Sequence, residues 1–165
     1  MKIAVKDANI LIDLVHGDLL EPCLRLPYEF VTTDLVLLQL EVEAQWTVVR
    51  PFVDSGVIRI ATLTGNEMES LASDPLYHAL GLVDLQVLWV ATREKGILLT
   101  GDLELREEAK RRKVTVHGLL WIMEQLIQER RLTPPEAAKG LRLVLAKNAY
   151  LPAKECERLL RQWEQ

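Results

Sequence analysis

The chain has 165 residues, of which 49% are hydrophobic and 27% charged, and its formal net charge at pH 7 is −4. This length and composition predict one globular domain with a sizeable core and exclude an intrinsically disordered protein. No apolar run approaches the roughly 20 residues that a membrane span needs. The charged start MKIAVKD also lacks the apolar centre of a signal peptide, so we expect a cytoplasmic protein.

The charge is distributed unevenly along the chain. Residues 1–92 contain 5 Lys or Arg and 13 Asp or Glu, a net charge of −8, whereas residues 93–165 contain 15 and 11, a net charge of +4. This asymmetry is compatible with an acidic metal site beside a basic phosphate-binding surface, although ordinary solvated helix faces are the commoner cause. Cys23 and Cys156 are too few and too far apart to indicate a disulfide framework or a metal knuckle.

Strand and helix patterns alternate along most of the chain, since short apolar runs predict strands and apolar stripes at helical spacing predict helices. In chain order we expect a strand at 2–6, a helix at 10–16, an irregular or weakly helical segment at 18–28, a strand at 29–32, a helix at 34–49, a strand at 57–62, helices at 67–73 and 82–95, a strand at 97–100, a helix at 103–112, a strand at 114–116 and a helix at 119–131. Two further helices are expected after the capping-box sequence Thr133-Pro-Pro-Glu136 and after Pro152.

This alternation predicts an α/β fold. A parallel sheet of four or five strands should lie between two helical layers, which makes a three-layer α/β/α sandwich. We expect a single domain over residues 1–165, with its core at about 1–131 and a C-terminal helical extension at about 132–165.

Three aspartates are expected at one rim of this sheet. Asp7 follows the first strand, Asp102 follows the strand at 97–100, and Asp84 lies in the first turn of the preceding helix. The carboxyl ends of parallel strands lie at the same rim, which is where ligands bind in open α/β folds. The sequence therefore predicts that the three carboxylates lie close together.

Each aspartate also has a purely structural explanation. Asp7 is a good helix N-cap, Asp84 is favoured by the helix dipole, and Gly101-Asp102 is typical turn chemistry. Together, however, carboxylates about 4 Å apart repel by roughly 4 kcal/mol at an effective dielectric of 20, which a cation or shared protons must relieve. Oxygen ligands without His or Cys suit Mg²⁺ or Mn²⁺. A site for one of these ions favours phosphodiester chemistry.

Other polar residues are weaker candidates for the same site. Gln39 and Glu43 are one turn apart on the helix expected at 34–49 and share a face, so either could supply a fourth group. Arg106 lies one turn after Asp102 and could face a phosphate. Lys110 begins the basic run KRRK, which is more often a solvated helix end than a nucleic-acid contact.

The order of the segments VKDANILIDL, GLVDLQVLWVATREKGILLTGD and LELREEAKRRKVTVHGLLWIMEQL resembles the PIN-domain family of metal-dependent nucleases. Many bacterial and archaeal members of this family are VapC-type toxins of toxin–antitoxin pairs. The resemblance covers residues 2–127 and implies a sandwich around a parallel sheet, a four-acid Mg²⁺ or Mn²⁺ site and hydrolytic cleavage of RNA. It also implies frequent homodimers and inhibition by a small antitoxin protein.

Carried over by this resemblance, Asp7 is the first acid of the site and Asn9 the neighbour that steadies it. Asp84 is the third acid and Asp102 the fourth. The family's second acid is a glutamate early on the helix after the second strand, and the alignment of TTDLVLLQLE places Gln39 there. A glutamine can hydrogen-bond but adds no negative charge, so Glu43 remains the alternative for this second acid.

The sequence therefore favours a metal-dependent endoribonuclease, similar to the toxin of a toxin–antitoxin pair. The departure at Gln39 keeps a second hypothesis open, namely a PIN-type binding module with a weakened metal site that acts through protein or RNA partners. A signalling receiver domain fits poorly, because VIRIATLTG carries no phosphoacceptor aspartate at the end of the third strand and His117 stands where a lysine is expected.

Overall fold

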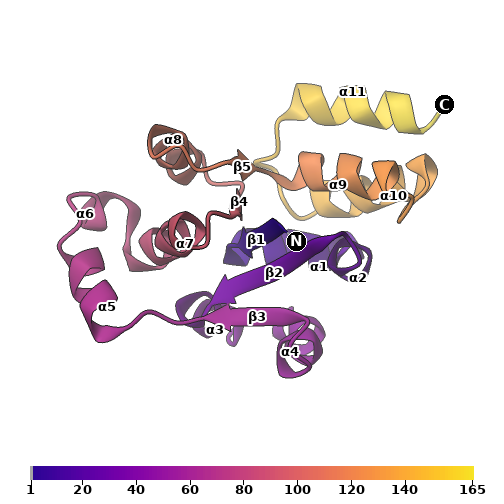
Figure 1. Ribbon diagram of the computed structural model, residues 1–165. Helices are drawn as coiled ribbons and strands as arrows, with labels where there is room; N and C mark the ends of the chain where they lie inside the picture. Colours follow the sequence, from indigo (N-terminus) through magenta and orange to yellow (C-terminus); the bar gives the residue numbers. More distant parts are fainter. Residues whose placement is uncertain (1) are drawn as a thin grey trace.

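The computed structural model describes residues 2–165, which form a sheet flanked by helices (Figure 1). Five strands make up the sheet: β1 (Lys2–Lys6), β2 (Tyr28–Thr33), β3 (Ile58–Ala61), β4 (Ile97–Leu99) and β5 (Val116–His117). Their order across the sheet is β3-β2-β1-β4-β5, and every neighbouring pair is parallel. The predicted α/β fold with a parallel sheet is confirmed.

The helices occupy most of the remaining chain. They are α1 (Ala8–His16), α2 (Leu20–Leu24), α3 (Asp34–Leu40), α4 (Trp46–Asp54), α5 (Gly65–Ala72), α6 (Tyr77–Leu80), α7 (Leu82–Arg93), α8 (Leu103–Arg111), α9 (Leu119–Gln128), α10 (Pro134–Leu145) and α11 (Ala153–Trp163). No helix among residues 2–165 is both long enough and apolar enough to cross a membrane.

The core lies on both faces of the sheet. Helix α7 packs on one face against β1, β2 and β4, and α1 lies on the other side with α4, α9 and α10 (Figure 1). The strand residues Val5, Val31 and Leu98 are fully buried because both sheet faces are covered, as expected for parallel strands. Helix α11 covers α10 from outside and buries Leu159 and Trp163 against the same core.

The strand order creates a switch point between β1 and β4. From β1 the chain proceeds to β2 and β3 on one side, and it then returns to place β4 and β5 on the other side of β1. Two chain segments leave the sheet in diverging directions at such a point, and the crevice between them is where ligands bind in open α/β sheets. Asp7 follows β1 and Gly101-Asp102 follows β4, so both segments bring an aspartate to this crevice.

The prediction of a single helix at 34–49 is wrong. The structure has two helices, α3 and α4, separated by turns at residues 41–45. The buried stripe Val36, Leu37 and Leu40 would continue at 43 and 44, but Glu43 is charged, Ala44 is small and both are exposed, so the face that holds the helix to the core ends. Pro51 lies inside α4.

Smaller differences have local causes. The last strand was expected at 114–116 but pairs only at Val116 and His117, because Lys113 adopts a left-handed φ of 58° and the amide of Val114 bonds back to Ala109 O of α8 at 2.8 Å. The short helices α2 and α6 were not distinguished in the sequence. Each has only one or two turns, too short for a clear apolar period.

Candidate active site

Asp7 is held at the start of α1. Its backbone is extended, and its Oδ1 accepts a hydrogen bond from the amide of Ile10 at 2.8 Å, so it caps the helix as its structural explanation predicted. Its Oδ2 accepts a hydrogen bond from the hydroxyl of Thr100 at the end of β4. The side chain is only 4% exposed, which places a carboxylate inside the protein where water cannot solvate it well.

Asp102 is held in the same way at the start of α8. Its Oδ1 accepts a hydrogen bond from the amide of Leu105 at 2.8 Å. The hydroxyl of Thr100 accepts a hydrogen bond from the amide of Asp102 at 3.1 Å while donating to Asp7. Thr100 is therefore a fully buried bridge that fixes the β1 end and the β4 end of the crevice relative to each other.

Asp84 reaches the site from the first turn of α7. Gly81 precedes this helix with a φ of 81° and a ψ of 164°, a conformation that is essentially restricted to glycine. This backbone conformation explains why a glycine stands at the cap. Asp84 is half-buried and lies near the positive end of the helix dipole.

The charges of the rim aspartates shift the pKa values of two of them. The pKa of Asp7 is raised from 3.8 to about 7, mainly by burial and to a smaller extent by the charges of Asp84 and Asp102, whereas the hydrogen bonds from Thr100 and Ile10 lower it. Burial also raises the pKa of Asp84 to about 6, with Asp102 and then Glu104 adding to the effect. The structure therefore brings the three predicted aspartates close enough to repel one another, and no Lys or Arg is among the groups that shift either pKa.

The other predicted site residues lie at different distances from this cluster. Asn9 is exposed in the first turn of α1 and borders the same cleft as Asp102. Gln39 is exposed near the end of α3, and Glu43 is exposed in the turns after it, so the two do not share a helix face as expected. Neither residue is among the groups that perturb Asp7 or Asp84.

The two basic candidates also differ. Arg106 folds back over the rim, where its Nη1 donates to the carbonyl of Thr100 at 3.4 Å. A Cβ on Gly118 would lie 2.6 Å from that Nη1, so glycine is what leaves room for the guanidinium. Lys110 lies further along α8, on its exposed side, and pairs with Glu107 at 2.9 Å.

Three polar residues at this rim were not singled out in the sequence. Thr100 is the last residue of the strand predicted at 97–100, and its position directly before Gly101-Asp102 was the only indication that it belongs to the site. Asp34 follows β2 and accepts a hydrogen bond from the side-chain amide of Gln86, two residues after Asp84 on α7, at 2.6 Å. The signal for Asp34 was the one used for Asp7, a carboxylate directly after a strand.

The family model DUF3368, described as a PIN domain, matches residues 3–165, which is nearly the whole chain. The chain belongs to the PIN-domain family. The comparison with curated proteins gives no match that would narrow the activity further. PIN domains in general are nucleases and typically use divalent metal ions.

The donor chemistry of this PIN domain fits a hard divalent cation. Asp7, Asp84 and Asp102 provide only oxygen, and their mutual repulsion is what a bound cation would relieve. Among residues 2–165, however, no three His, Cys, Asp or Glu side chains are arranged closely enough to ligate one ion as they stand. Mg²⁺ typically uses only one or two protein carboxylates and completes its shell with water and substrate phosphate, which is compatible with such an open arrangement.

Proposed function

We propose that this PIN domain is a metal-dependent endoribonuclease that hydrolyses RNA phosphodiester bonds. The observation that carries the proposal is a crevice at the sheet's switch point in which the charges of Asp84 and Asp102 raise the pKa of the buried Asp7, and the charge of Asp102 raises that of Asp84. Buried carboxylates that repel one another and form no salt bridge destabilise a folded chain and are typical of functional sites.

In this proposal the three aspartates hold Mg²⁺ or Mn²⁺. The ion supplies the Lewis acidity that makes a water nucleophilic near neutral pH and offsets charge on the scissile phosphate. Thr100 holds Asp7 and Asp102 in place by its two hydrogen bonds, so that the carboxylates need not reorganise during the reaction. Asn9 borders the cleft beside Asp102 and can hydrogen-bond the sugar–phosphate backbone, and Arg106 provides a cation at the rim.

Purified protein incubated with a mixed-sequence single-stranded RNA tests the proposal. Cleavage should require Mg²⁺ or Mn²⁺, should stop with EDTA and should be lost in Asp84→Asn, which keeps the shape of the side chain but removes its charge. A matched control is Asp54→Asn at the exposed end of α4, which should cleave as the unmodified protein does. Cleavage that persists in EDTA or in Asp84→Asn would contradict the proposal.

A second candidate function is a binding module that has weakened its metal site. It is favoured by Gln39, which stands where the family has an acid, and by the absence of a tight three-ligand cluster among residues 2–165. This module would bind RNA without cleaving it under any metal. Binding with no cleavage at millimolar Mn²⁺ would therefore favour the module over the enzyme.

We further propose that the protein is the toxin of a toxin–antitoxin pair, works in the cytoplasm, forms a homodimer and is inhibited by a small partner. The order of its motifs, which resembles the VapC-type members of the family, supports this role. An adjacent reading frame that encodes a small DNA-binding protein, together with growth arrest that its co-expression relieves, would support the role. Harmless expression of a protein that cleaves RNA would argue against it.

A further inference from the structure

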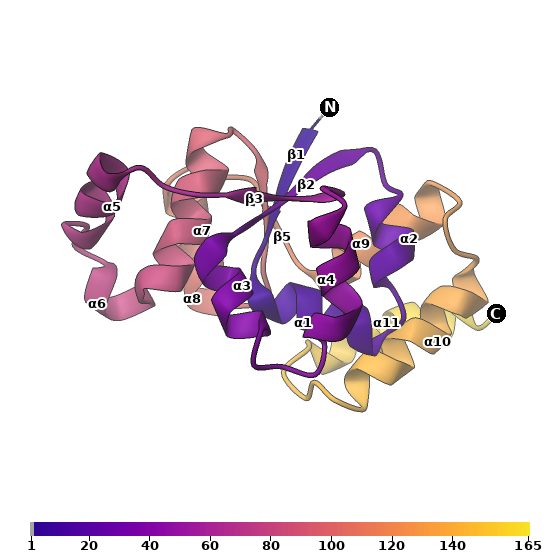
Figure 2. The same ribbon diagram turned by 90° about the horizontal axis from the view of Figure 1, so that it is seen from below.

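A cleft of about 400 Å³ runs from the acid cluster along α1. One side is formed by Gly101 and Asp102, and the floor is one face of α1. The opposite side is the loop between α10 and α11, residues 146–152, which we call the α10–α11 loop (Figure 2). The lining residues that carry the following steps are Asn9, Asp13, Asp102, Lys147, Asn148 and Tyr150.

The α10–α11 loop is fixed in this position by a polar contact. The side-chain amide of Asn148 donates to Asp13 Oδ2 of α1 at 2.9 Å, and the Asn148 Oδ1 accepts from the amide of Tyr150 at 2.9 Å. Asp13 is itself buried, so replacing the bond by water is unfavourable. The loop is therefore a formed wall of the cleft.

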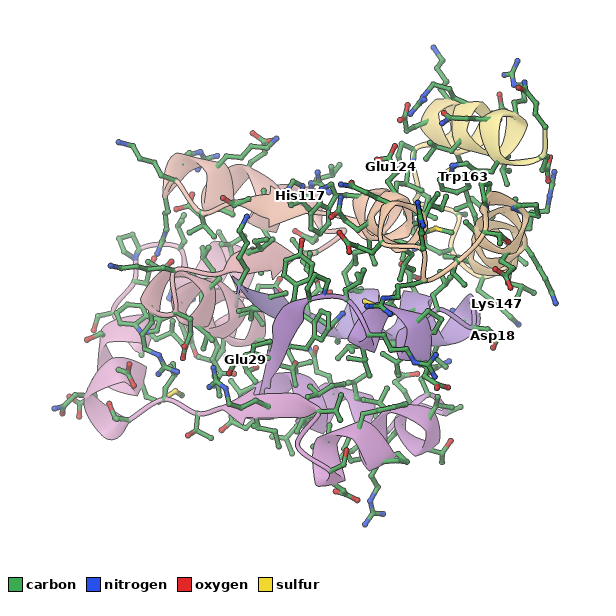
Figure 3. The ribbon with its side chains drawn as sticks, turned by 45° about the vertical axis from the view of Figure 1, so that its right-hand side comes forward. Asp18, Glu29, His117, Glu124, Lys147 and Trp163 are labelled. Atoms are coloured by element: carbon green, nitrogen blue, oxygen red, sulfur yellow. The ribbon has the colours of Figure 1, made fainter. Side chains whose placement is uncertain are left out.

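Two side chains of this wall have no partner among residues 2–165. Tyr150 is 98% exposed, although an aromatic ring gains by burial. Lys147 is exposed beside α1, as Figure 3 shows, and forms no ion pair with any residue of the described chain. An aromatic face and a cation along one groove match a nucleic-acid single strand, in which bases stack on rings and phosphates follow the positive charge.

Building on the proposed function, we infer that the α10–α11 loop is the second wall of the RNA-binding groove. A base adjacent to the cleaved bond stacks on Tyr150, and Lys147 contacts a backbone phosphate further along α1. Both residues are positioning and binding residues, because they lie across the cleft from Asp102 and do not touch the reacting bond. Their effect should appear in the affinity for single strands and not in metal binding.

The inference is tested by fluorescence anisotropy with a labelled 12-nucleotide single-stranded RNA and the full-length protein, in an Asp102→Asn background that suppresses cleavage. Tyr150→Ala should weaken binding by about 10-fold, whereas Tyr150→Phe, which keeps the ring, should stay within about 2-fold. Lys147→Ala should lower the slope of log affinity against log salt by about 0.7, the value for one phosphate contact.

Lys154→Ala, at an exposed lysine of α11 outside the cleft, is the matched control and should change neither the affinity nor the slope. In the unmodified background, Tyr150→Ala and Lys147→Ala should bind Mn²⁺ as the unmodified protein does, which separates a groove residue from a metal-site residue. RNA affinities that are the same in all four variants overturn the inference, and this is the result expected if the cleft serves a protein partner. If the unmodified protein neither binds nor cleaves RNA, the proposed function itself fails.

Discussion

The two ends of helix α8 hold acids in opposite ways. At its C-terminal end the nearly buried Glu108 accepts hydrogen bonds from Arg111 at 2.8 Å and from Arg112 at 2.7 Å, and Arg112 also donates to both oxygens of Asp74 at 3.1 and 3.2 Å. At its N-terminal end Asp102 lies with Asp7 and Asp84, and its charge raises the pKa of both.

The difference separates a structural acid cluster from a functional one. Arg112 neutralises its two acids and satisfies their oxygens, so that cluster stabilises the packing of α8 against the segment before α6. The rim cluster accepts hydrogen bonds from Thr100 and from helix amides but has no cation comparable to Arg112. Its charges therefore lower the free energy of unfolding. A bound divalent ion would offset the charge of this cluster.

The largest expected effect is on RNA cleavage, which should differ between variants at the two ends of α8. Asp102→Asn should lower RNA cleavage by on the order of 100-fold or more, since it removes charge from the metal site. Glu108→Gln should leave cleavage within about 2-fold, because its amide oxygen can still accept from an arginine. Initial rates under saturating Mn²⁺ measure both, and equal losses in the two variants would remove the distinction.

For the free energy of unfolding, the C-terminal cluster of α8 should matter more than the rim cluster. Arg112→Ala leaves Glu108 and Asp74 without their shared partner and should lower the free energy of unfolding by about 3 kcal/mol. Arg158→Ala removes an exposed pair with Glu155 on α11 and should lower the free energy of unfolding much less, because solvent screens this pair. Urea denaturation measures both changes, and a cost for Arg112→Ala no larger than for Arg158→Ala would show that the cluster is not structural.

Removing a rim acid should instead stabilise the metal-free protein. The pKa of Asp7 is raised from 3.8 to about 7, so the folded state binds its proton more tightly than the unfolded state does. The free energy of unfolding in EDTA should therefore fall as the pH rises from about 4 to about 7. Asp84, with its pKa raised to about 6, acts in the same direction.

Asp7→Asn should remove most of this fall while keeping an N-cap side chain. In EDTA at pH 8 the variant should be more stable than the unmodified protein by on the order of 2 kcal/mol, and at pH 5 the difference should be smaller. Urea denaturation at the two pH values measures this. A variant that is less stable than the unmodified protein at pH 8 would mean that the Asp7 carboxylate is adequately solvated or paired.

The smallest effect concerns the missing acid. Gln39 is exposed on α3 and is not among the groups that perturb the aspartates, so Gln39→Glu should change Mn²⁺ affinity by no more than about 3-fold. Glu43→Gln should have no effect for the same reason. Calorimetric titrations compare the variants, and a gain of 10-fold or more in Gln39→Glu would instead support the weakened-module hypothesis.

The sequence was informative where local rules decide the structure. Asp7, Asp84 and Asp102 each lie at a strand end or a helix start, and the parallel sheet then fixes which rim they share. The prediction that Glu43 lies on the same helix as Gln39 was wrong. The end of α3 depends on which helix face packs on the core, and helix propensity alone does not predict this.

The remaining features arise from long-range packing. The bond between Asn148 and Asp13 joins residues that are 135 positions apart, so the wall opposite Asp102 exists only because α10 packs on α1. The bridge from Thr100 to Asp7 likewise depends on β4 lying beside β1, across 93 positions. Neither contact has a sequence period or a motif from which it could be predicted.

Calorimetric titration of the metal-free protein with Mn²⁺ at pH 6.5 tests the central claim, that the uncompensated rim acids bind a divalent ion, most directly. The account predicts one bound ion and release of protons, seen as a heat that depends on the buffer, because Asp7 and Asp84 must give up protons to act as ligands. Asp102→Asn should weaken this binding and Glu108→Gln should not. No binding at millimolar Mn²⁺, or equal binding by both variants, would contradict the account.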